Sequence, residues 1–489
     1  MLLLVSLGMW ALASPVGASP DEDFHLTSSW CGQGIRDGTC EASAQASERL
    51  IPQALLGAPC FAFQPEQSAA CQGTRITDPG DAMVSTTRGN FTGDYPPLFF
   101  AFTGLFVGDD IGGSVLAMRL ANALIFVLMT GATFWLAPPA LRRTLVAGIA
   151  VTIIPLGVFI VPSINPSSWA VTSAATVFLA VVIHMTAESR RRIALSGILS
   201  AVAVSIGAGA RADSALYAAL AVGAALVVTF RPTREGLLRM IFPGLLAVAA
   251  ALAFLNTGQS SAVSGTSPQA LSVSRLVQLL TDVPELWVGA LGKWGLGWLD
   301  TTMPPIIWTV MLALFAAAIL SGVRGLGRKQ ALAAAGVALA TWLVPAYIQY
   351  LTGVPVGAYV QPRYILPLLI LLVLTVLCRV TGTGLRLSPA QRWLAVIGVG
   401  GANALALYIN LRRYVSGTDV VAANLDFGRE WWWPDALLTP TGVWLVGGAA
   451  FLSALILLSR DLVDGADRHD SMAHRLEAAV PEGTKEPRG

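Results

Sequence analysis

A series of long apolar runs is the feature that most restricts how this chain can fold. A transmembrane helix needs about 20 apolar residues to cross the hydrocarbon core of a bilayer. Of the 489 residues, 54% are apolar and 12% are charged, against roughly 25% charged in soluble domains. The sequence therefore predicts an all-α polytopic membrane protein with about twelve transmembrane helices. The approximate spans are 2–18, 115–136, 145–161, 170–186, 193–210, 215–230, 237–255, 306–323, 331–351, 365–380, 393–409 and 443–459.

Basic loops alternate between these spans and predict their orientation. By the positive-inside rule, short loops rich in arginine and lysine lie on the cytoplasmic side. The rule places both termini inside, and it places a large first loop outside, followed by two smaller external loops at 256–305 and 411–440. The basic residues concerned are Arg142, Arg143, Arg190, Arg191, Arg192, Arg231, Arg234, Arg239, Arg324, Arg328, Lys329, Arg379, Arg386 and Arg392.

The predicted spans divide the chain into six parts. Residues 95–107 are apolar, but counting them as a span would invert every later loop, so we expect a juxtamembrane or re-entrant helix there. The segment Val16-Gly17-Ala18 resembles a signal-peptidase site; we expect an uncleaved span, because cleavage would remove the membrane anchor of Asp21. The parts are a first transmembrane helix (1–19), an external loop with an acidic motif, four cysteines and the juxtamembrane helix (20–113), transmembrane helices 2–7 (114–255), an external loop with an amphipathic helix (256–305), transmembrane helices 8–12 (306–459) and a disordered cytoplasmic tail (460–489).

Four of the five cysteines fall in the first external loop, and their clustering predicts disulfides outside the cytoplasm. Four cysteines allow three pairings. The pairs Cys31–Cys40 and Cys60–Cys71 are expected because short loops close most readily. A zinc site is the alternative, but the paired C-x-x-C spacing of structural zinc sites is missing. Cys378 lies in an apolar run and is expected to be a small buried residue.

Three carboxylates follow the first span at once: Asp21, Glu22 and Asp23. The span ends near residue 18, so these acids are held at the membrane surface. A carboxylate there can take a proton from a hydroxyl, hold a metal, or end a helix in water. Partial desolvation among three acids is expected to raise the pKa of at least one of them, which would make it a better base.

Few cations lie beside the spans on the predicted external side. Arg363 and Arg211 each offer a planar fork of donors suited to phosphate. Asp213 is an alternative partner for Arg211. Lys293 lies among tryptophans, which mark either an interfacial belt or a sugar-stacking surface. Further polar groups expected to face an external cavity are His25, Tyr95, Asn165 and Tyr364.

Several function classes are disfavoured by what the chain lacks. It contains no glycine-rich phosphate loop, no H-E-x-x-H motif and no supported Ser-His-Asp arrangement. Nucleotide-driven transport and zinc proteolysis are therefore disfavoured. The net charge of +2 gives no indication of a nucleic-acid partner.

Taken together, the short motifs resemble the GT-C superfamily of membrane glycosyltransferases, and within it a bacterial group of multi-spanning proteins catalogued as a domain of unknown function. The motifs are the Pro-Asp-Glu-x-x-His segment after the first span, Tyr-Pro-Pro-Leu-Phe-Phe at the end of the first external loop, Arg-Leu-x-Asn-Ala (residues 119–123), an Asn-Pro-Ser turn and a late Pro-Arg-Tyr.

The resemblance implies a bacterial plasma-membrane enzyme that takes a sugar from a polyprenyl-phosphate donor. The acceptor would be a cell-envelope glycan, lipid or protein outside the membrane. It implies that Asp21 is the catalytic base, supported by Glu22 or Asp23, and that Arg363 stabilises the leaving phosphate. Arg211 or Lys293 would assist. A divalent cation is needed by some members of the superfamily and not by others.

Two other functions share these features. A flippase or transporter of lipid-linked saccharides would normally carry charges within several spans, and these span interiors are nearly free of them. A polymerase or ligase keeps its large polar loop late in the chain, whereas the largest loop here is the first. A scaffold role for the disulfide-containing loop is a third alternative.

Overall fold

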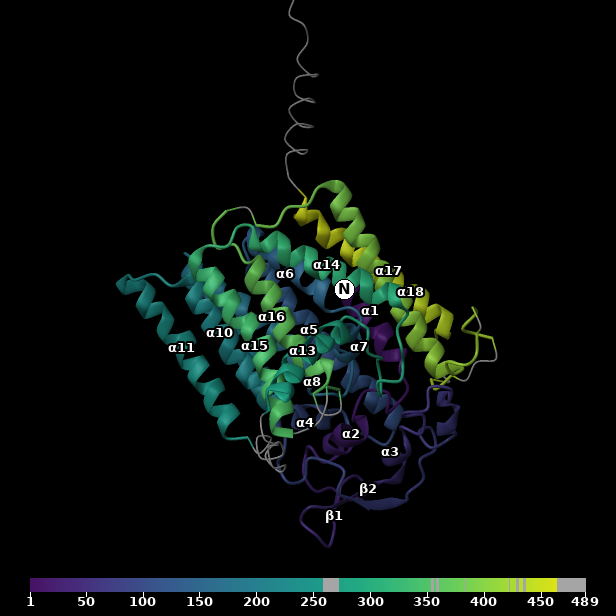
Figure 1. Cartoon of the computed structure of the whole chain (residues 1–489). Helices are drawn as coiled ribbons and strands as arrows, with labels where there is room; N and C mark the ends of the chain where they lie inside the picture. The colour runs from purple at the N-terminus through teal and green to yellow at the C-terminus, as the bar shows by residue number, and fades with distance from the viewer. Residues whose placement is uncertain are drawn as a thin grey trace, which may run out of the picture.

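The computed structural model describes residues 1–257, 272–352, 356–357, 360–382, 384–421, 423–427, 431–433 and 437–463. Most of the predicted tail lies outside the described residues, at 464–489. In the described part, the protein is a mostly helical bundle with a smaller mixed region at one end (Figure 1). This is the architecture of a polytopic membrane protein.

Every predicted span contains a helix, but the described residues include nine helices long and apolar enough to cross a membrane, so the expected twelve are not confirmed. The nine are α5 (Ile111–Leu136), α8 (Ser167–Thr186), α9 (Arg190–Ala210), α10 (Ala212–Thr229), α11 (Arg234–Leu255), α14 (Pro305–Val323), α15 (Arg328–Thr352), α17 (Pro389–Val415) and α18 (Pro440–Leu458). Two shorter apolar helices are α1 (Leu2–Leu12) and α16 (Pro362–Leu377).

The remaining predicted span, 145–161, is broken in two. It is divided between α6 (Pro139–Thr152) and α7 (Leu156–Ile160). Pro155 lies at the break, where a proline can donate no helical hydrogen bond and its ring clashes with the preceding turn. A continuous apolar run therefore gives two helices here.

Helix α8 lies at the centre of the bundle. All its residues from Ser167 to Met185 are buried, and α5, α9, α10 and α16 pack against it. Helix α11 is at the edge, where it contacts α10 and α9 and exposes many leucines (Figure 1). An exposed apolar edge of this kind is expected for a helix that faces lipid.

The loops predicted to be cytoplasmic gather at one end of the bundle. Arg239 donates to the carbonyl of Ala187 at 2.7 Å, and Lys329 donates to that of Phe230 at 2.5 Å. The mixed region lies at the opposite end (Figure 1). The bundle therefore has two distinct ends, and its orientation across the bilayer stays a prediction.

The mixed region, residues 21–110, is called the disulfide region below. Its helices are α2 (Glu22–Trp30), α3 (Gln53–Gly57) and α4 (Leu98–Thr103), and the last lies where the juxtamembrane helix was expected. Strands β1 (Glu41–Ala42), β2 (Arg49–Pro52) and β3 (Met83–Thr86) form an antiparallel sheet in the order β1-β2-β3. The all-α prediction missed this sheet, because each strand is too short to show a periodic pattern.

Both predicted disulfides are present, Cys31–Cys40 and Cys60–Cys71. Cys378 is a free, buried cysteine, as expected.

The first helix is shorter than the apolar run that predicts it. Helix α1 ends at Leu12, six residues before the expected end at Ala18. Pro15 and Pro20 disfavour a longer helix, and Gly17 adopts a left-handed φ of 85°. The chain therefore leaves the helix early and continues as an irregular segment, residues 13–20, into the disulfide region.

Side chains from distant parts of the chain satisfy the carbonyl groups around this irregular segment. Unpaired backbone groups away from water are costly, so such a segment needs donors from its surroundings. The donors include Trp433 to Leu12 at 2.9 Å, Asn410 to Ala13 at 2.8 Å, Trp298 to Gly17 at 2.9 Å and Gln72 to Val16 at 2.7 Å.

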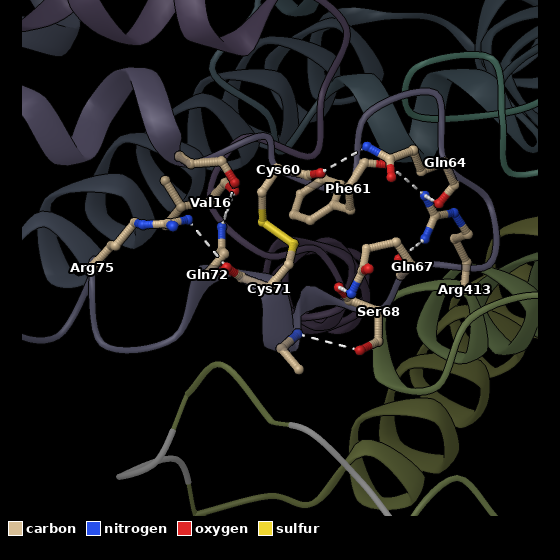
Figure 2. Close-up of a disulfide and its surroundings, with 12 residues drawn as sticks. Val16, Cys60, Phe61, Gln64, Gln67, Ser68, Cys71, Gln72, Arg75 and Arg413 are labelled. Carbon is tan, nitrogen blue, oxygen red and sulfur yellow. Dashed lines mark hydrogen bonds between the residues drawn. A yellow bond between two sulfur atoms is a disulfide. The ribbon is translucent and has the colours of Figure 1, made fainter.

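Arg413, near the end of α17, holds the Cys60–Cys71 loop (Figure 2). Its guanidinium donates to the carbonyls of Phe61 and Gln64, both at 2.9 Å, and of Gln67 at 2.6 Å. It also pairs with Asp300 at 2.9 Å, and both side chains are buried. One arginine thus joins the disulfide region, α17 and the loop after α13 (Val273–Ala290).

We expect Arg413→Ala to lower the free energy of unfolding by about 3–5 kcal/mol, because it leaves the buried Asp300 carboxylate without its partner. Thermal unfolding in detergent measures this. The matched control is Arg412→Ala, since Arg412 is half-buried and, among the described residues, its side chain donates to the carbonyl of Thr418 alone. Equal stability of the two variants would contradict the prediction.

Candidate functional site

The three consecutive acids lie at the start of α2, but their side chains have different surroundings. Asp21 is the N-cap residue and adopts a left-handed conformation with φ 55°. Side-chain exposure is 39% for Asp21, 19% for Asp23 and 0% for Glu22. Of the three, Asp21 is therefore the most accessible to a substrate.

Glu22 forms a buried ion pair with Arg119 of α5. The distance from Nη2 of Arg119 to Oε1 of Glu22 is 3.0 Å, and Arg119 is 1% exposed. Arg119 also donates to the carbonyls of Ala11, Ser14 and Pro15, while Glu22 accepts from the backbone N–H of Ser19 at 2.7 Å. The pair fastens the irregular segment to the bundle, so Glu22 is placed to position the site rather than to contact a substrate.

Asp21 lies between two arginines. Arg363, the second residue of α16, donates to Oδ2 of Asp21 at 2.6 Å. Arg88, from the loop after β3, donates to Oδ1 of Asp21 at 3.3 Å and to Asp23 at 2.7 Å. The structure thus brings together Asp21 and Arg363, which are 342 residues apart in the chain.

Arg363 is buried at 3% exposure but has unused hydrogen-bonding capacity. Its Nη2 donates to the hydroxyl of Tyr364 at 2.9 Å, and its Nη1 donates to Gln361. Its Nε has no hydrogen-bond partner among the described residues. A small cavity adjoins Arg363, and its lining includes Pro20, Gln361 and Leu296.

Arg211 lies beside this group, against the ring of Tyr364. Its guanidinium carbon is 4.5 Å from the centroid of the Tyr364 ring and 5.6 Å from that of Tyr95. Two hydrogen bonds of 2.8 and 2.9 Å join Arg211 to Asp213. The alternative partner considered from the sequence is therefore present, and Arg211 contributes a cation whose charge is largely matched by Asp213.

His25 is buried in an aromatic cage next to the acids. Its ring lies against Phe24, Tyr95 and Phe100. Burial lowers the pKa of His25 to about 3, although the nearby Asp21 opposes the change. The imidazole is therefore neutral at ordinary pH, and its Nδ1 has no hydrogen-bond partner in the described structure.

Asn165 and Lys293 differ in how they relate to this cluster. Asn165 is buried and donates to the carbonyl of Pro20 at 2.8 Å, so it holds the residue that precedes Asp21. Lys293 is 44% exposed and pairs with Glu285 at 3.6 Å. Among the described residues, no hydrogen bond or ion pair links Lys293 to Asp21 or Arg363.

The pKa of Asp21 differs from the sequence-based expectation. Burial raises it and is the largest single influence, but Arg363, His25 and Arg88 act in the opposite direction. The net effect lowers the pKa of Asp21 below its ordinary value of 3.8. The rise expected for at least one of the three acids does not occur at Asp21, because two arginines approach it.

Two important residues were not assigned roles from the sequence. Arg119 was part of a quoted motif, and a lone arginine in an apolar span is itself a signal of a buried partner. Arg88 lies in a polar loop with no regular pattern, so no sequence signal indicated its contact with the acids.

The surroundings of the acids bear on whether they could hold a metal. No group of three or more histidine, cysteine, aspartate or glutamate side chains converges among them. The three acids of the motif are instead each paired with an arginine. We therefore assign no step to a divalent cation.

A comparison with family models matches residues 4–372 to a family described as a predicted membrane protein, DUF2142. The chain belongs to this family. The matched region contains most of α1, the disulfide region, both arginines that contact Asp21, and Arg119. A comparison with curated proteins finds no match. The family description and the apolar helices together indicate a multi-pass membrane protein, and the description assigns no activity.

We expect Glu22→Gln to lower the free energy of unfolding by about 3–5 kcal/mol, since it leaves Arg119 buried without a counter-charge. The control is Asp23→Asn, whose partner Arg88 is 45% exposed; loss of such a pair costs about 1 kcal/mol or less. Thermal unfolding in detergent compares the two. A fully stable Glu22→Gln protein would show that this carboxylate does not hold the site together.

Proposed function

We propose that the protein is a GT-C type glycosyltransferase that moves a sugar from a polyprenyl-phosphate donor to a cell-envelope acceptor. The acceptor is a glycan, lipid or protein outside the bacterial plasma membrane. The observation that carries the proposal is the contact between Asp21 and Arg363. It places a partly exposed carboxylate beside a buried guanidinium with an unused donor, next to a cavity at the end of the bundle.

The location of Asp21 suits a donor that is anchored in the bilayer. The prenyl chain holds the phosphate and the reacting carbon of the sugar close to the membrane surface. Asp21 follows the irregular segment after α1, and Arg363 begins α16. Both groups therefore lie where the disulfide region meets the bundle, and we expect this end of the bundle to lie at the level of the donor phosphate.

The reaction needs a base and a stabilised leaving group. Asp21 takes the proton from the acceptor hydroxyl, and the hydroxyl oxygen forms a bond to the anomeric carbon of the donor sugar. The bond from that carbon to the phosphate oxygen breaks, and its electron pair leaves with polyprenyl phosphate. Arg363 donates hydrogen bonds to this phosphate, which is a charge-assisted interaction. A single displacement of this kind inverts the anomeric configuration.

Donor binding and base strength are coupled in this arrangement. Arg363 holds Asp21 as an ion pair and thereby lowers its pKa, which weakens it as a base. A donor phosphate competes with Asp21 for the same guanidinium. Occupation of the site therefore weakens the ion pair and makes Asp21 more basic when a sugar is present.

We expect Asp21→Asn to reduce transfer by about 100-fold or more, because it removes the base. Asparagine keeps the size of the side chain and tolerates the left-handed conformation of this position. The assay measures release of polyprenyl phosphate from a panel of short-chain polyprenyl-phosphate glycosides carrying glucose, galactose, mannose or arabinose.

Asp81→Asn is the control, because Asp81 is an exposed acid of the same region. If Asp21→Asn transfers sugar normally, the proposed mechanism is wrong.

The pH dependence of transfer gives a second test. The ionised carboxylate is the active form, so activity falls as the pH drops through the pKa of Asp21, which lies below 3.8. Arg88→Gln removes one of the charges that lower this pKa and should move the acidic limb to higher pH. The profile of kcat/KM against pH measures the shift. Identical acidic limbs in both proteins would exclude Asp21 as the group that titrates.

A further inference from the structure

A second cavity, of about 220 Å³, lies within the disulfide region. This is smaller than the roughly 300–1,000 Å³ of pockets for drug-sized ligands. Its walls are formed by residues from α2, the Cys31–Cys40 loop, β2, the loop after β3 and α4. They include Ser28, Ile35, Arg49, Asn90 and Phe91.

The cavity combines an aromatic ring with free hydrogen-bond donors. The guanidinium carbon of Arg49 lies 5.6 Å from the centroid of the Phe91 ring. Nη1 of Arg49 donates to the carbonyls of Ala46 and Glu48, which fixes the side chain. Its Nε and Nη2 have no partner among the described residues. This arrangement suits a sugar. The Phe91 ring can stack on the C–H groups of a sugar ring, and the Arg49 guanidinium can donate to its hydroxyl or carboxylate oxygens.

One loop joins this cavity to the acids. Arg88 contacts Asp21 and Asp23, and two residues later the backbone N–H of Asn90 donates to Ser28 at 2.8 Å. The Asn90 side chain also exchanges two hydrogen bonds, of 2.9 and 2.8 Å, with the backbone of Tyr95. The loop is therefore held both at the acids, by Arg88, and at the cavity, by Asn90.

The separation between the cavity and Asp21 suits an extended glycan. Ser28 follows Asp21 by seven residues along α2, which is about two helical turns, or roughly 10 Å, at a rise of 1.5 Å per residue. The donor is unsuited to the cavity, because its prenyl chain must remain in the bilayer and the cavity lies in the polar disulfide region. The acceptor has no such restriction.

We infer that this cavity binds a sugar unit of the acceptor glycan, a few units away from the hydroxyl that Asp21 deprotonates. That the bound glycan is the acceptor rests on the proposed function. Phe91 stacks against the sugar ring and Arg49 donates to its oxygens. The disulfide region thereby selects the acceptor, while the bundle holds the donor.

Binding of oligosaccharides to the full-length protein in nanodiscs tests the inference. The probes are fragments of two to six sugar units, released by mild acid from the cell envelope of the source organism, and saturation-transfer NMR detects their binding. We expect the wild-type protein to bind a fragment and Phe91→Ala to bind it about tenfold more weakly. Arg49→Ala should also weaken binding. Its control is Arg75→Ala, because Arg75 is an exposed arginine that donates to the carbonyl of Cys71 in the same region.

A second variant tests the cavity even if Phe91→Ala does not fold. Ile35 is 56% exposed at the cavity, so Ile35→Trp should fill the cavity without disturbing a core. We expect it to abolish binding while both disulfides still form, as non-reducing mass spectrometry shows. The inference is overturned if the wild-type protein binds none of the fragments, or if Phe91→Ala and Ile35→Trp both bind like the wild type.

The same variants separate this inference from the proposed function. Asp21→Asn should bind the fragments normally and fail to transfer. If fragments bind at the cavity but no polyprenyl-phosphate glycoside is consumed, the cavity stands as a glycan-binding site and the transferase proposal fails. If transfer occurs and Phe91→Ala leaves the KM for the acceptor unchanged, the transferase proposal stands and the cavity assignment fails.

Discussion

The buried ion pair between Glu22 and Arg119 is the interaction on which the rest of the site depends. The chain leaves α1 after Leu12 and continues without regular structure beside an apolar bundle. Arg119 satisfies three carbonyls around this segment, and Glu22 neutralises the charge that Arg119 brings into the interior. Without both partners, the start of α2 would lose its buried attachment to α5.

Because Glu22 is directed into the bundle, its two neighbours are left to face other partners. Asp21 contacts Arg363 and Arg88, and Asp23 contacts Arg88. Glu22 therefore anchors the segment to α5, Asp23 pairs with Arg88 inside the disulfide region, and Asp21 remains accessible beside the start of α16. This division of roles follows from burial and charge pairing rather than from any difference in chemistry between carboxylates.

The disulfide region and the bundle depend on each other in a similar way. Arg413 and Trp298 attach the Cys60–Cys71 loop and the irregular segment to the bundle. In return, the disulfide region supplies the Asp21 carboxylate to Arg363 of α16 and the Glu22 carboxylate to Arg119 of α5. The disulfide region therefore stabilises the arrangement of the bundle, in addition to its role in the proposed acceptor site.

The sequence by itself determined the apolar helices, the two ends of the bundle and both disulfides, because these depend on local composition and short loop closure. It also selected Asp21, Arg363, Arg211, Tyr95 and Tyr364, which the structure brings together. Only the tertiary structure decided that α1 ends early, that Glu22 is buried with Arg119, and that the pKa of Asp21 falls rather than rises. Each of these depends on a partner far away in the chain, and such a contact leaves no periodic pattern in the sequence.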